Sequence, residues 1–224
     1  MKRRPEPELM DSEAQTRAYA EADFDASNSL FTEKFKEYFK ELPAQGSLVD
    51  LGCGPGDISI RMACQYPGWT VLGLDAGINM LKFAQQRLAD ENLAARVSFQ
   101  QSYLPDPSLA ASSFDSVISN SLLHHLPQPH VLWQSIVQVA RPGAAIQVMD
   151  LMRPDSKEEA QRLVDTYASG APQVLIDDFY NSLLAAYTPR EISGQLLATG
   201  LDRLKIEIAS DRHWIVHGRI GNGS

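Results

Sequence analysis

A glycine-rich turn directly after an apolar run is the feature whose residue types and spacing most clearly indicate chemistry. Residues 48–57 read Leu-Val-Asp-Leu-Gly-Cys-Gly-Pro-Gly-Asp. Glycine has no Cβ and tolerates positive φ, so the backbone of such a turn can approach a ligand closely. A helix beginning at Asp57 would add free N–H groups beside the turn. The segment therefore predicts a small-ligand site.

The ligand predicted for this turn is not a dinucleotide. The dinucleotide fingerprint requires Gly-x-Gly-x-x-Gly, and Asp57 stands at the sixth position. A pyrophosphate would meet that carboxylate, so an uncharged or zwitterionic ligand suits the turn better. Asp75 lies about 20 residues after the glycines, where an acid can accept hydrogen bonds from ribose hydroxyls. The alternative role for Asp75 is to cap the helix that follows.

Two adjacent histidines, His124 and His125, follow the apolar run 114–119. Histidine has a pKa suited to general-base work, and adjacent side chains usually point in different directions. We therefore expect at most one of them to be catalytic, and packing roles remain the alternative. Substrate contacts are expected from Tyr19, Arg153, Tyr180 and Asn181, although a pair between Asp150 and Arg153 is the favoured alternative for Arg153.

Strands alternating with helices must position these groups. Apolar runs at 47–51, 69–74, 96–100, 114–119 and 144–149 read as strands, and helices are expected at 57–65, 77–91 and 130–140. This alternation predicts a parallel sheet that is covered on both faces. Two last runs, 204–208 and 213–219, are joined by so short a link that the final strand must be antiparallel.

Segments outside the alternation are expected to cover the site. Residues 1–46 form an arm and helices that are a lid candidate, with residues 1–12 a loose arm. Residues 47–224 form the main domain, into which 151–200 inserts a helical cap with helices at 156–168, 177–187 and 189–199. In the last of these, Thr188 is a natural N-cap and Pro189 occupies the first helical position.

The composition excludes several classes of protein. Acidic residues outnumber basic ones by 28 to 20, which argues against binding nucleic acid by neutralising phosphates. No apolar run is long enough to span a membrane, and we expect no secretory signal. Two cysteines, Cys53 and Cys64, form neither a disulfide framework nor a zinc site, so we expect no metal and a cytoplasmic location.

Four segments in this order resemble the class I S-adenosylmethionine-dependent methyltransferases, in particular their ubiquinone-biosynthesis-type and small-molecule members. Residues 50–56 are similar to the first motif of that family, and Asp75 matches the ribose acid of the second. Residues 114–126 resemble the segment around the fourth strand, and residues 141–144 resemble the turn before the fifth. The resemblance implies a Rossmann-like, doubly wound α/β fold whose seven-stranded sheet has its last strand antiparallel beside the fifth.

The resemblance also implies which residues bind the cofactor, S-adenosylmethionine. The glycines would line its methionine and ribose parts, with Asp50 near its amino group and Met80 over its adenine. Met80 at helical spacing also fits plain core packing. Members often carry an adenine-binding acid after the third strand, where this chain has Ser102 and Tyr103 and only later Asp106. The complete expected set is Asp50, Gly52, Gly54, Gly56, Asp75, Ala76, Met80, Ser102, Tyr103 and Asn120.

The expected function is therefore methyl transfer from S-adenosylmethionine to a small-molecule acceptor. Such an in-line displacement depends mainly on positioning and on excluding water, and it needs a base only when the acceptor must lose a proton. A non-catalytic module that binds S-adenosylmethionine or S-adenosylhomocysteine is the alternative. An NAD(P)-linked oxidoreductase is disfavoured by Asp57 and by the closing hairpin. The acceptor atom and the oligomeric state cannot be read from the residues.

Overall fold

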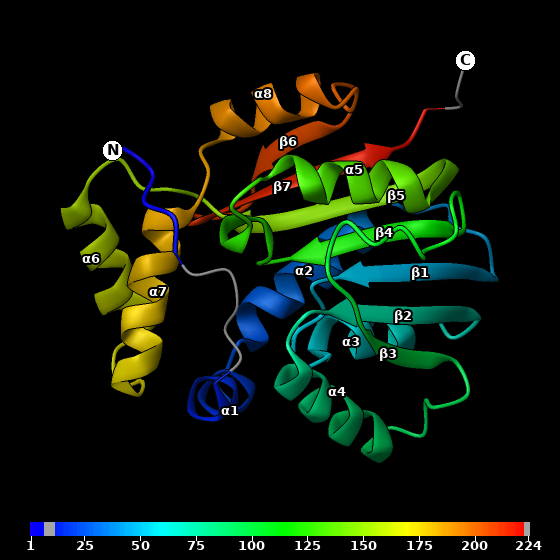
Figure 1. The fold of residues 1–224 in the computed structure, drawn as a ribbon, viewed down its shortest axis with the longest axis horizontal. Coiled ribbons are helices and arrows are strands. Elements are labelled where there is room, and N and C mark those ends of the chain that lie inside the picture. The colour runs from blue at the N-terminus through cyan, green and yellow to red at the C-terminus, as the bar shows by residue number, and fades with distance from the viewer. Residues whose placement is uncertain (7–11, 222–224) are drawn as a thin grey trace.

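One mixed sheet of seven strands organises the chain in a computed structural model that describes residues 1–6 and 12–221 (Figure 1). The strand order is β3-β2-β1-β4-β5-β7-β6, and β7 pairs antiparallel with both β5 and β6. The strands are β1 (Gly46–Leu51), β2 (Trp69–Asp75), β3 (Val97–Gln101), β4 (Phe114–Asn120), β5 (Ala140–Leu151), β6 (Lys205–Ile208) and β7 (His213–Arg219). The expected fold class, with the antiparallel last strand beside the fifth, is confirmed.

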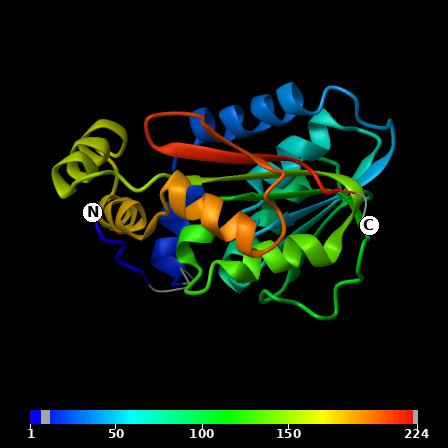
Figure 2. The ribbon, with the colours of Figure 1, turned by 90° about the horizontal axis from the view of Figure 1, so that it is seen from above.

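Helices cover both faces of this sheet and extend beyond one edge. They are α1 (Glu13–Glu21), α2 (Asp25–Tyr38), α3 (Asp57–Gln65), α4 (Ile78–Asp90), α5 (His130–Val139), α6 (Lys157–Tyr167), α7 (Gln173–Ala185) and α8 (Pro189–Ala198), with a short 3-10 turn, η1 (Leu123–His125). Seen from above, α2 and α3 lie on one side of the sheet and α5 and α8 on the other (Figure 2). The sheet is therefore buried on both faces, as parallel sheets require.

Apolar side chains from these layers form two cores, one on each side of the sheet. Phe31 and Phe35 of α2 pack with Met62 of α3 against the β1–β2 face. Trp133 of α5 and Trp214 of β7 are fully buried in the opposite core. Because both faces of the central strands are buried, their register is fixed, and the carboxyl ends of β1, β2, β4 and β5 meet at one edge.

The segment expected to form the cap divides into two parts. Helices α6 and α7 lie beyond the carboxyl edge of β5 and share a small core that contains Leu163 and Leu183 (Figure 1). Helix α8 instead packs on the sheet side, where Ile192 and Leu196 join the core of α5. Its start has the expected form, with Thr188 in a capping box and Pro189 in the first turn. Only α6 and α7 are therefore placed to cover a site at this edge.

Residues 1–6 are docked on the cap rather than loose. The Arg3 guanidinium donates to the carbonyls of Ala185 and His124, and the Arg4 N–H donates to Leu184. Arg3 also lies 4.1 Å above the ring of Tyr187. The expectation of a loose arm is wrong for these residues, because a guanidinium can satisfy carbonyls left open at a helix end. Residues 7–11 of that arm lie outside the described residues.

Among the helices that the structure describes, none combines the length and the apolar character that crossing a bilayer requires.

Candidate functional site

A cavity of about 1400 Å³ opens at the carboxyl edge of the parallel strands, where ligands bind in open α/β sheets. Its walls come from the glycine turn, from the ends of β2 and β4, from η1 and from helices α1, α2 and α7. Ligand pockets typically measure about 300–1,000 Å³. The cavity is therefore large enough for a cofactor and a second small molecule side by side.

The glycine turn at the floor of the cavity has the backbone that its sequence predicts. Gly52, Gly54 and Gly56 have φ values of 77°, 52° and 82°, in the left-handed region. The N–H groups of Gly52 and Cys53 donate to the carbonyl of Leu74 and so join the turn to β2. This anchoring holds the turn open toward the cavity.

The two later glycines of the turn have different roles. A Cβ on Gly54 would meet nothing within 4 Å, so its backbone borders open space that a ligand can fill. A Cβ on Gly56 would lie 2.7 Å from the Phe99 ring and 2.9 Å from Ala84. Gly54 lines the cavity and Gly56 does not. Gly56 is thus required for the close packing of α3, whereas Gly54 leaves room for a ligand.

Asp75 ends β2 and supports the turn with both of its carboxylate oxygens. Oδ2 accepts from the N–H of Gly54 and Oδ1 accepts from the N–H of Gly77, each at 2.8 Å. The carboxylate also lines the cavity, with Ala76 beside it. A carboxylate oxygen accepts more than one hydrogen bond, so ribose hydroxyls remain compatible with these contacts. The two roles considered for Asp75 can therefore coexist.

Two buried polar groups show that the site fits a zwitterionic ligand with a cationic amino group. Asp50 is 1% exposed, and burial raises the pKa of its carboxyl to about 7, although the Ser59 hydroxyl donates to it at 2.6 Å. The Oδ1 atom of Asn120 is buried and, within the described residues, has no hydrogen-bond partner. Both residues line the cavity. An amino group bound here would satisfy both acceptors, so the residues present fit S-adenosylmethionine.

Among the described residues, the part of the cavity wall that follows β3 carries hydroxyl groups and no acid. Ser102 and Tyr103 follow β3 and line the cavity together with Met80. Asp106 lies behind them, where its carboxylate accepts from the Ser102 hydroxyl at 2.7 Å. Met80 is 7% exposed, so it is both core and wall. Of the ten residues expected to bind the cofactor, the cavity brings together all except Gly56.

His124 is held in one orientation by Asp150. The Nδ1–H group of its ring donates to Asp150 Oδ1 at 2.5 Å, and its backbone N–H donates to Oδ2 of the same carboxylate. A carboxylate accepts hydrogen bonds but does not donate them, so the proton of neutral His124 lies on Nδ1 and Nε2 carries a lone pair. The expected pair between Asp150 and Arg153 is not formed.

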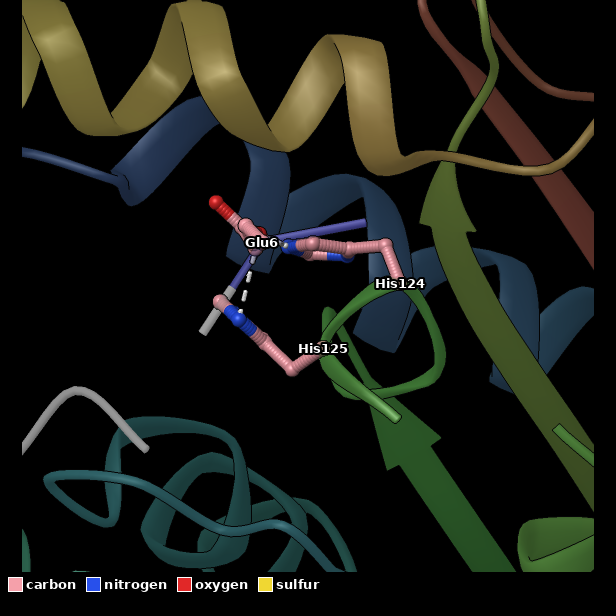
Figure 3. A group of neighbouring side chains, drawn as sticks. All are labelled: Glu6, His124 and His125. Atoms are coloured by element: carbon pink, nitrogen blue, oxygen red, sulfur yellow. Dashed lines mark ion pairs between the residues drawn. The ribbon is translucent and has the colours of Figure 1, made fainter. Parts of the chain in front are cut away.

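Glu6 closes this part of the site from the N-terminal segment. One carboxylate oxygen lies 3.6 Å from Nε2 of His124 and 3.2 Å from Nδ1 of His125, and both rings point toward it (Figure 3). Burial lowers the pKa of His124, but the charge of Asp150 outweighs it and the net shift is upward. Burial and the neighbouring His124 hold the pKa of His125 well below its usual range. Burial raises the pKa of the Glu6 carboxyl.

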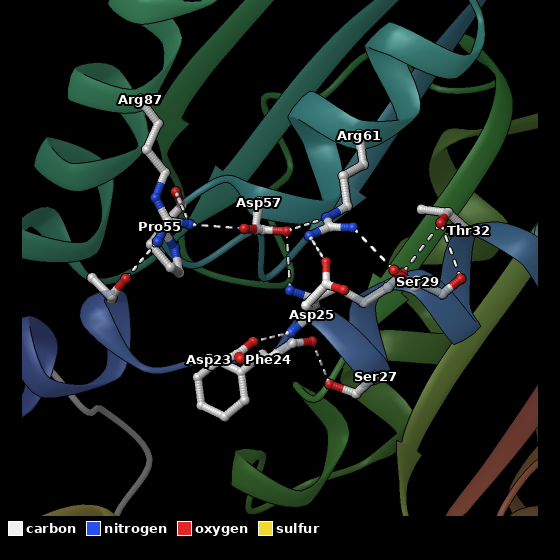
Figure 4. Close-up of polar contacts among 12 residues, drawn as sticks. Asp23, Phe24, Asp25, Ser27, Ser29, Thr32, Pro55, Asp57, Arg61 and Arg87 are labelled. Atoms are coloured by element: carbon white, nitrogen blue, oxygen red, sulfur yellow. Dashed lines mark hydrogen bonds and ion pairs between the residues drawn. The ribbon is translucent and has the colours of Figure 1, made fainter. Parts of the chain in front are cut away.

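A network of charged side chains holds the N-terminal helices against the cofactor half of the cavity (Figure 4). Asp57 pairs with Arg61 at 2.5 Å and with Arg87 at 3.2 Å. Arg61 also reaches Asp25 of α2 at 2.7 Å, and Arg87 donates to the carbonyl of Ala20 in α1. The Asp57 carboxylate is therefore paired with two arginine side chains of the protein itself.

The residues expected to bind substrate are only partly brought together. Tyr19 lines the cavity, and burial raises the pKa of its hydroxyl to about 12, so it remains a hydrogen-bond donor. Arg153 lies outside the lining and donates to the Ala186 carbonyl and to Glu191. Tyr180 packs in the α6–α7 core and Asn181 is exposed, and neither is among the described residues of the cavity wall.

Other residues of the acceptor side were missed from the sequence. Phe179 and Ser182 of α7 line the cavity, and the Ser182 hydroxyl donates to Glu6 at 3.1 Å. Ser182 lies on the same helix as the two residues expected there but on its inward face. Because α7 begins at Gln173, four residues before its expected start, helical periodicity read from the correct start could have found it. No pattern in the sequence indicated that Glu6 belongs to the site.

Comparison with known proteins agrees with this geometry. Residues 48–143 match the family model of a methyltransferase domain. A demethylmenaquinone methyltransferase from Lactiplantibacillus plantarum is 33% identical over 116 residues, which are 51% of this chain and 48% of that protein. A trans-aconitate 2-methyltransferase from Methylobacterium nodulans is 31% identical over 135 residues, 58% of this chain and 47% of that protein. The chain thus spans about half the length of the curated relatives it matches.

The fold is shared more widely than the sequence. The crystal structure of an S-adenosylmethionine-dependent methyltransferase from Aquifex aeolicus superposes with a TM-score of 0.65 at 16% identity. That superposition covers 93% of this chain and 98% of the other. Residues 48–143, which contain the glycine turn, Asp75 and the histidine pair, are therefore similar in sequence to a methyltransferase domain, and the chain shares its fold with an S-adenosylmethionine-dependent methyltransferase.

Proposed function

We propose that this protein transfers a methyl group from S-adenosylmethionine to a small-molecule acceptor. The observation that carries the proposal is one continuous cavity whose floor holds the glycine turn, Asp75 and Asn120 and whose far wall holds His124 and α7. The cofactor supplies a methyl group on a sulfonium, which is open to in-line attack. The protein must place the acceptor in line with that methyl group and exclude water.

The cofactor half of the cavity is assigned to Asp50, Gly52, Gly54, Asp75, Ala76, Met80, Ser102, Tyr103 and Asn120. Asp50 and the Asn120 carbonyl would accept from the amino group, because both are buried acceptors at the same floor. Asp75 would accept from the ribose hydroxyls. Gly56 contributes indirectly by allowing α3 to start at the turn.

The acceptor half is assigned to Tyr19, Phe179, Ser182 and the histidine pair. Leu126, Leu151 and Leu175 add apolar surface to the same cavity. The Asp178 carboxylate lines this side, whereas the arginines of the cavity wall are paired, Arg61 and Arg87 with Asp57 and Arg212 with Asp211. This balance favours a neutral, largely apolar acceptor with a hydroxyl group over an anionic one such as aconitate.

His124 is the better placed of the two histidines to receive a proton when the acceptor must lose one. Asp150 fixes its tautomer, so that Nε2 presents a lone pair on the inner side of the ring. The imidazolium that forms would remain paired with Asp150. His125 has no such carboxylate on its other nitrogen among the described residues, and its pKa is lowered.

The setting proposed for this reaction is a reducing, cytoplasmic one without nucleic-acid or membrane partners. Both cysteines are free thiols, Cys53 inside the glycine turn and Cys64 exposed, which supports a reducing compartment.

Calorimetry and mass spectrometry test the proposal together. S-Adenosylhomocysteine is expected to bind with a micromolar dissociation constant, about −8 kcal/mol, whereas NAD and NADP give no heat. A hydroxylated aromatic acceptor incubated with S-adenosylmethionine is expected to gain the mass of one methylene group. Binding of the nucleoside without methylation of any acceptor in a panel would favour a non-catalytic module. Binding of a nicotinamide dinucleotide instead would contradict the proposal.

A further inference from the structure

Three side-chain atoms that can bind a metal ion converge at the inner end of the N-terminal segment. They are the carboxylate oxygen of Glu6, Nε2 of His124 and Nδ1 of His125, all within 4.8 Å of one another. The Nδ1 atom of His125 is buried and has no hydrogen-bond partner among the described residues. When both rings are deprotonated at the atoms that face Glu6, the three atoms direct lone pairs toward a common point where one cation could bind all of them.

From this convergence we propose that Glu6, His124 and His125 bind one divalent transition-metal ion at the acceptor side of the cavity. Two imidazoles and one carboxylate are ligands that zinc, iron and cobalt accept. Metal–ligand bonds of about 2.0–2.2 Å place neighbouring ligand atoms roughly 3.0–3.5 Å apart. The two distances from Glu6, 3.2 Å and 3.6 Å, are close to that spacing before any ion is added.

The support behind the cluster is typical of a metal site. A ligating histidine usually donates its other ring N–H to a carboxylate, which fixes the tautomer and the ring orientation. His124 makes this contact with Asp150, a residue that is itself 1% exposed. The Ser182 hydroxyl donates to the Glu6 oxygen that faces the histidines, and Arg3 anchors the segment of Glu6 on the His124 carbonyl. The ligands come from two elements, the N-terminal segment and η1, and side chains of β5 and α7 support them.

Protons can also satisfy the cluster, because an N–H on Nε2 of His124 or on Nδ1 of His125 would face the Glu6 carboxylate. A metal ion satisfies all three atoms at once. Three protein ligands also leave coordination positions open, and both histidines line the cavity. An oxygen atom of the acceptor can complete the coordination there, and this role, unlike the site itself, rests on the proposed function. With the ion bound, Nε2 of His124 is a ligand and no longer receives the proton, so the metal ion would replace His124 in activating the acceptor.

His124 and His125 stand out in the sequence as catalytic candidates, but nothing in the sequence joins them to Glu6 as a set of metal ligands. Glu6 and His124 are more than 100 positions apart, and only the docking of residues 1–6 on α7 joins them. The expectation of no metal is therefore replaced here by a specific, testable site.

Zinc titration of the purified protein, without cofactor or acceptor, tests the site directly. The titrations are made on Cys64→Ser protein, because the exposed thiol of Cys64 would bind zinc on its own. One ion per chain is expected to bind with a micromolar or lower dissociation constant. Glu6→Gln and His125→Gln are each expected to weaken binding about tenfold or more, since loss of even an outer carboxylate costs roughly 10–100-fold.

Control variants separate this site from adventitious binding. His130→Gln removes an exposed histidine at the start of α5 and is expected to leave zinc affinity unchanged. Cobalt in place of zinc is expected to give visible absorption bands that Glu6→Gln shifts or abolishes. Glu6 lies outside any helix or strand, so Glu6→Gln decides the matter even where His125→Gln fails to fold.

The proposal is overturned when zinc binds no more tightly than millimolar, or when Glu6→Gln and His125→Gln both leave its affinity unchanged. Because S-adenosylhomocysteine binding is measured separately, failure of the metal site leaves the methyl-transfer proposal standing. Zinc binding at this site without any binding of S-adenosylhomocysteine would instead support the metal site and contradict the methyl-transfer proposal.

Discussion

The carboxylate of Asp75 is bonded to the backbone N–H of Gly54 across the floor of the cavity, at 2.8 Å. Its other oxygen caps Gly77 at the start of α4. One side chain thus holds the glycine turn, the end of β2 and the next helix in register. Asp75, which matches the ribose-binding acid of the family, therefore also has a structural role. Substitutions at this position should affect both the stability of the turn and the affinity for the ligand.

Asp75→Ala is expected to weaken S-adenosylhomocysteine binding by about 1.5–3 kcal/mol, the usual cost of losing charge-assisted hydrogen bonds. The melting temperature should fall as well, because Gly54 and Gly77 lose their acceptor. Calorimetry on protein whose circular dichroism is unchanged measures the first effect, and thermal unfolding without ligand measures the second. Unaltered affinity in a folded variant would mean that Asp75 has only the structural role of holding Gly54 and Gly77.

Gly54→Ala and Gly56→Ala form a matched pair that separates ligand space from packing. Both glycines have positive φ, which costs alanine roughly 1–2 kcal/mol. A Cβ on Gly56 would also collide with Phe99 and Ala84, so Gly56→Ala should lose distinctly more stability to urea. Gly54→Ala should instead lose more cofactor affinity, since its Cβ would enter the open cavity. Equal stability losses would refute the packing role of Gly56.

The glycine turn and the strand–helix alternation were sufficient to predict the fold. Val49 and Leu51 make β1 apolar, and both faces of a central parallel strand must be buried. The same logic placed Asp75 and Asn120 at one edge, because carboxyl ends of parallel strands meet there. Local pattern and chain order therefore predict almost completely which residues meet at the floor of the cavity.

The acceptor half depends on contacts that local pattern does not encode. Arg153 has Asp150 three positions away, yet it pairs with Glu191, because Asp150 is taken by His124. Glu6 reaches the histidines only because the Arg3 guanidinium docks its segment on α7. Such pairings are selected by competition among buried polar groups in the folded state, so residue spacing alone cannot identify them.

Cofactor binding is expected to release a proton near neutral pH. Burial raises the pKa of Asp50 to about 7, above its ordinary 3.8, so the folded free protein holds a proton that the unfolded chain loses. This group therefore stabilises the fold fully below about pH 4, and its contribution is lost as the pH rises through about 7. A bound cationic amino group would favour the ionised carboxylate.

Calorimetry of S-adenosylhomocysteine binding at about pH 6.5 checks this linkage in two buffers with different ionisation enthalpies. The observed enthalpy should differ between phosphate and Bis-Tris buffers in proportion to the fraction of a proton released. Asp50→Asn, which cannot ionise, should remove most of that difference. Identical enthalpies for the unaltered protein in both buffers would mean that Asp50 does not titrate on binding.

Asp150→Asn tests how far His124 depends on its carboxylate partner. An asparagine that keeps the oxygen toward the backbone N–H would turn its amide toward Nδ1 and so disfavour the present tautomer. The turnover number for methyl transfer is expected to fall by about 10²-fold, whereas S-adenosylhomocysteine affinity is retained. The same change at Asp155, an exposed acid beyond the end of β5, is the matched control. Unchanged turnover in Asp150→Asn would remove the His124–Asp150 pair from the reaction.

A hydrogen-bonded contact joins α1 and α7, the two helices proposed to form a lid over the cavity. The Gln15 amide of α1 donates to both carboxylate oxygens of Asp178 on α7, at 2.9 Å and 3.0 Å. Helix α1 is also joined to the cofactor turn, because Arg87 reaches its Ala20 carbonyl while paired with Asp57. Binding of the cofactor should therefore reduce local opening of α1, and through Gln15 it should also reduce local opening of α7.

Amide exchange with and without S-adenosylhomocysteine measures this coupling. We expect the cofactor product to slow exchange in residues 13–25 and 170–187, because lids are segments of low local stability that bound ligand restrains. Gln15→Ala should remove the protection of 170–187 while residues 50–57 stay protected. Gln161→Ala, which removes an exposed contact within α6, should change neither segment. Protection confined to 50–57 and 75–80 in the unaltered protein would mean that α1 and α7 are a fixed surface layer, and the acceptor would then enter a cavity that does not close.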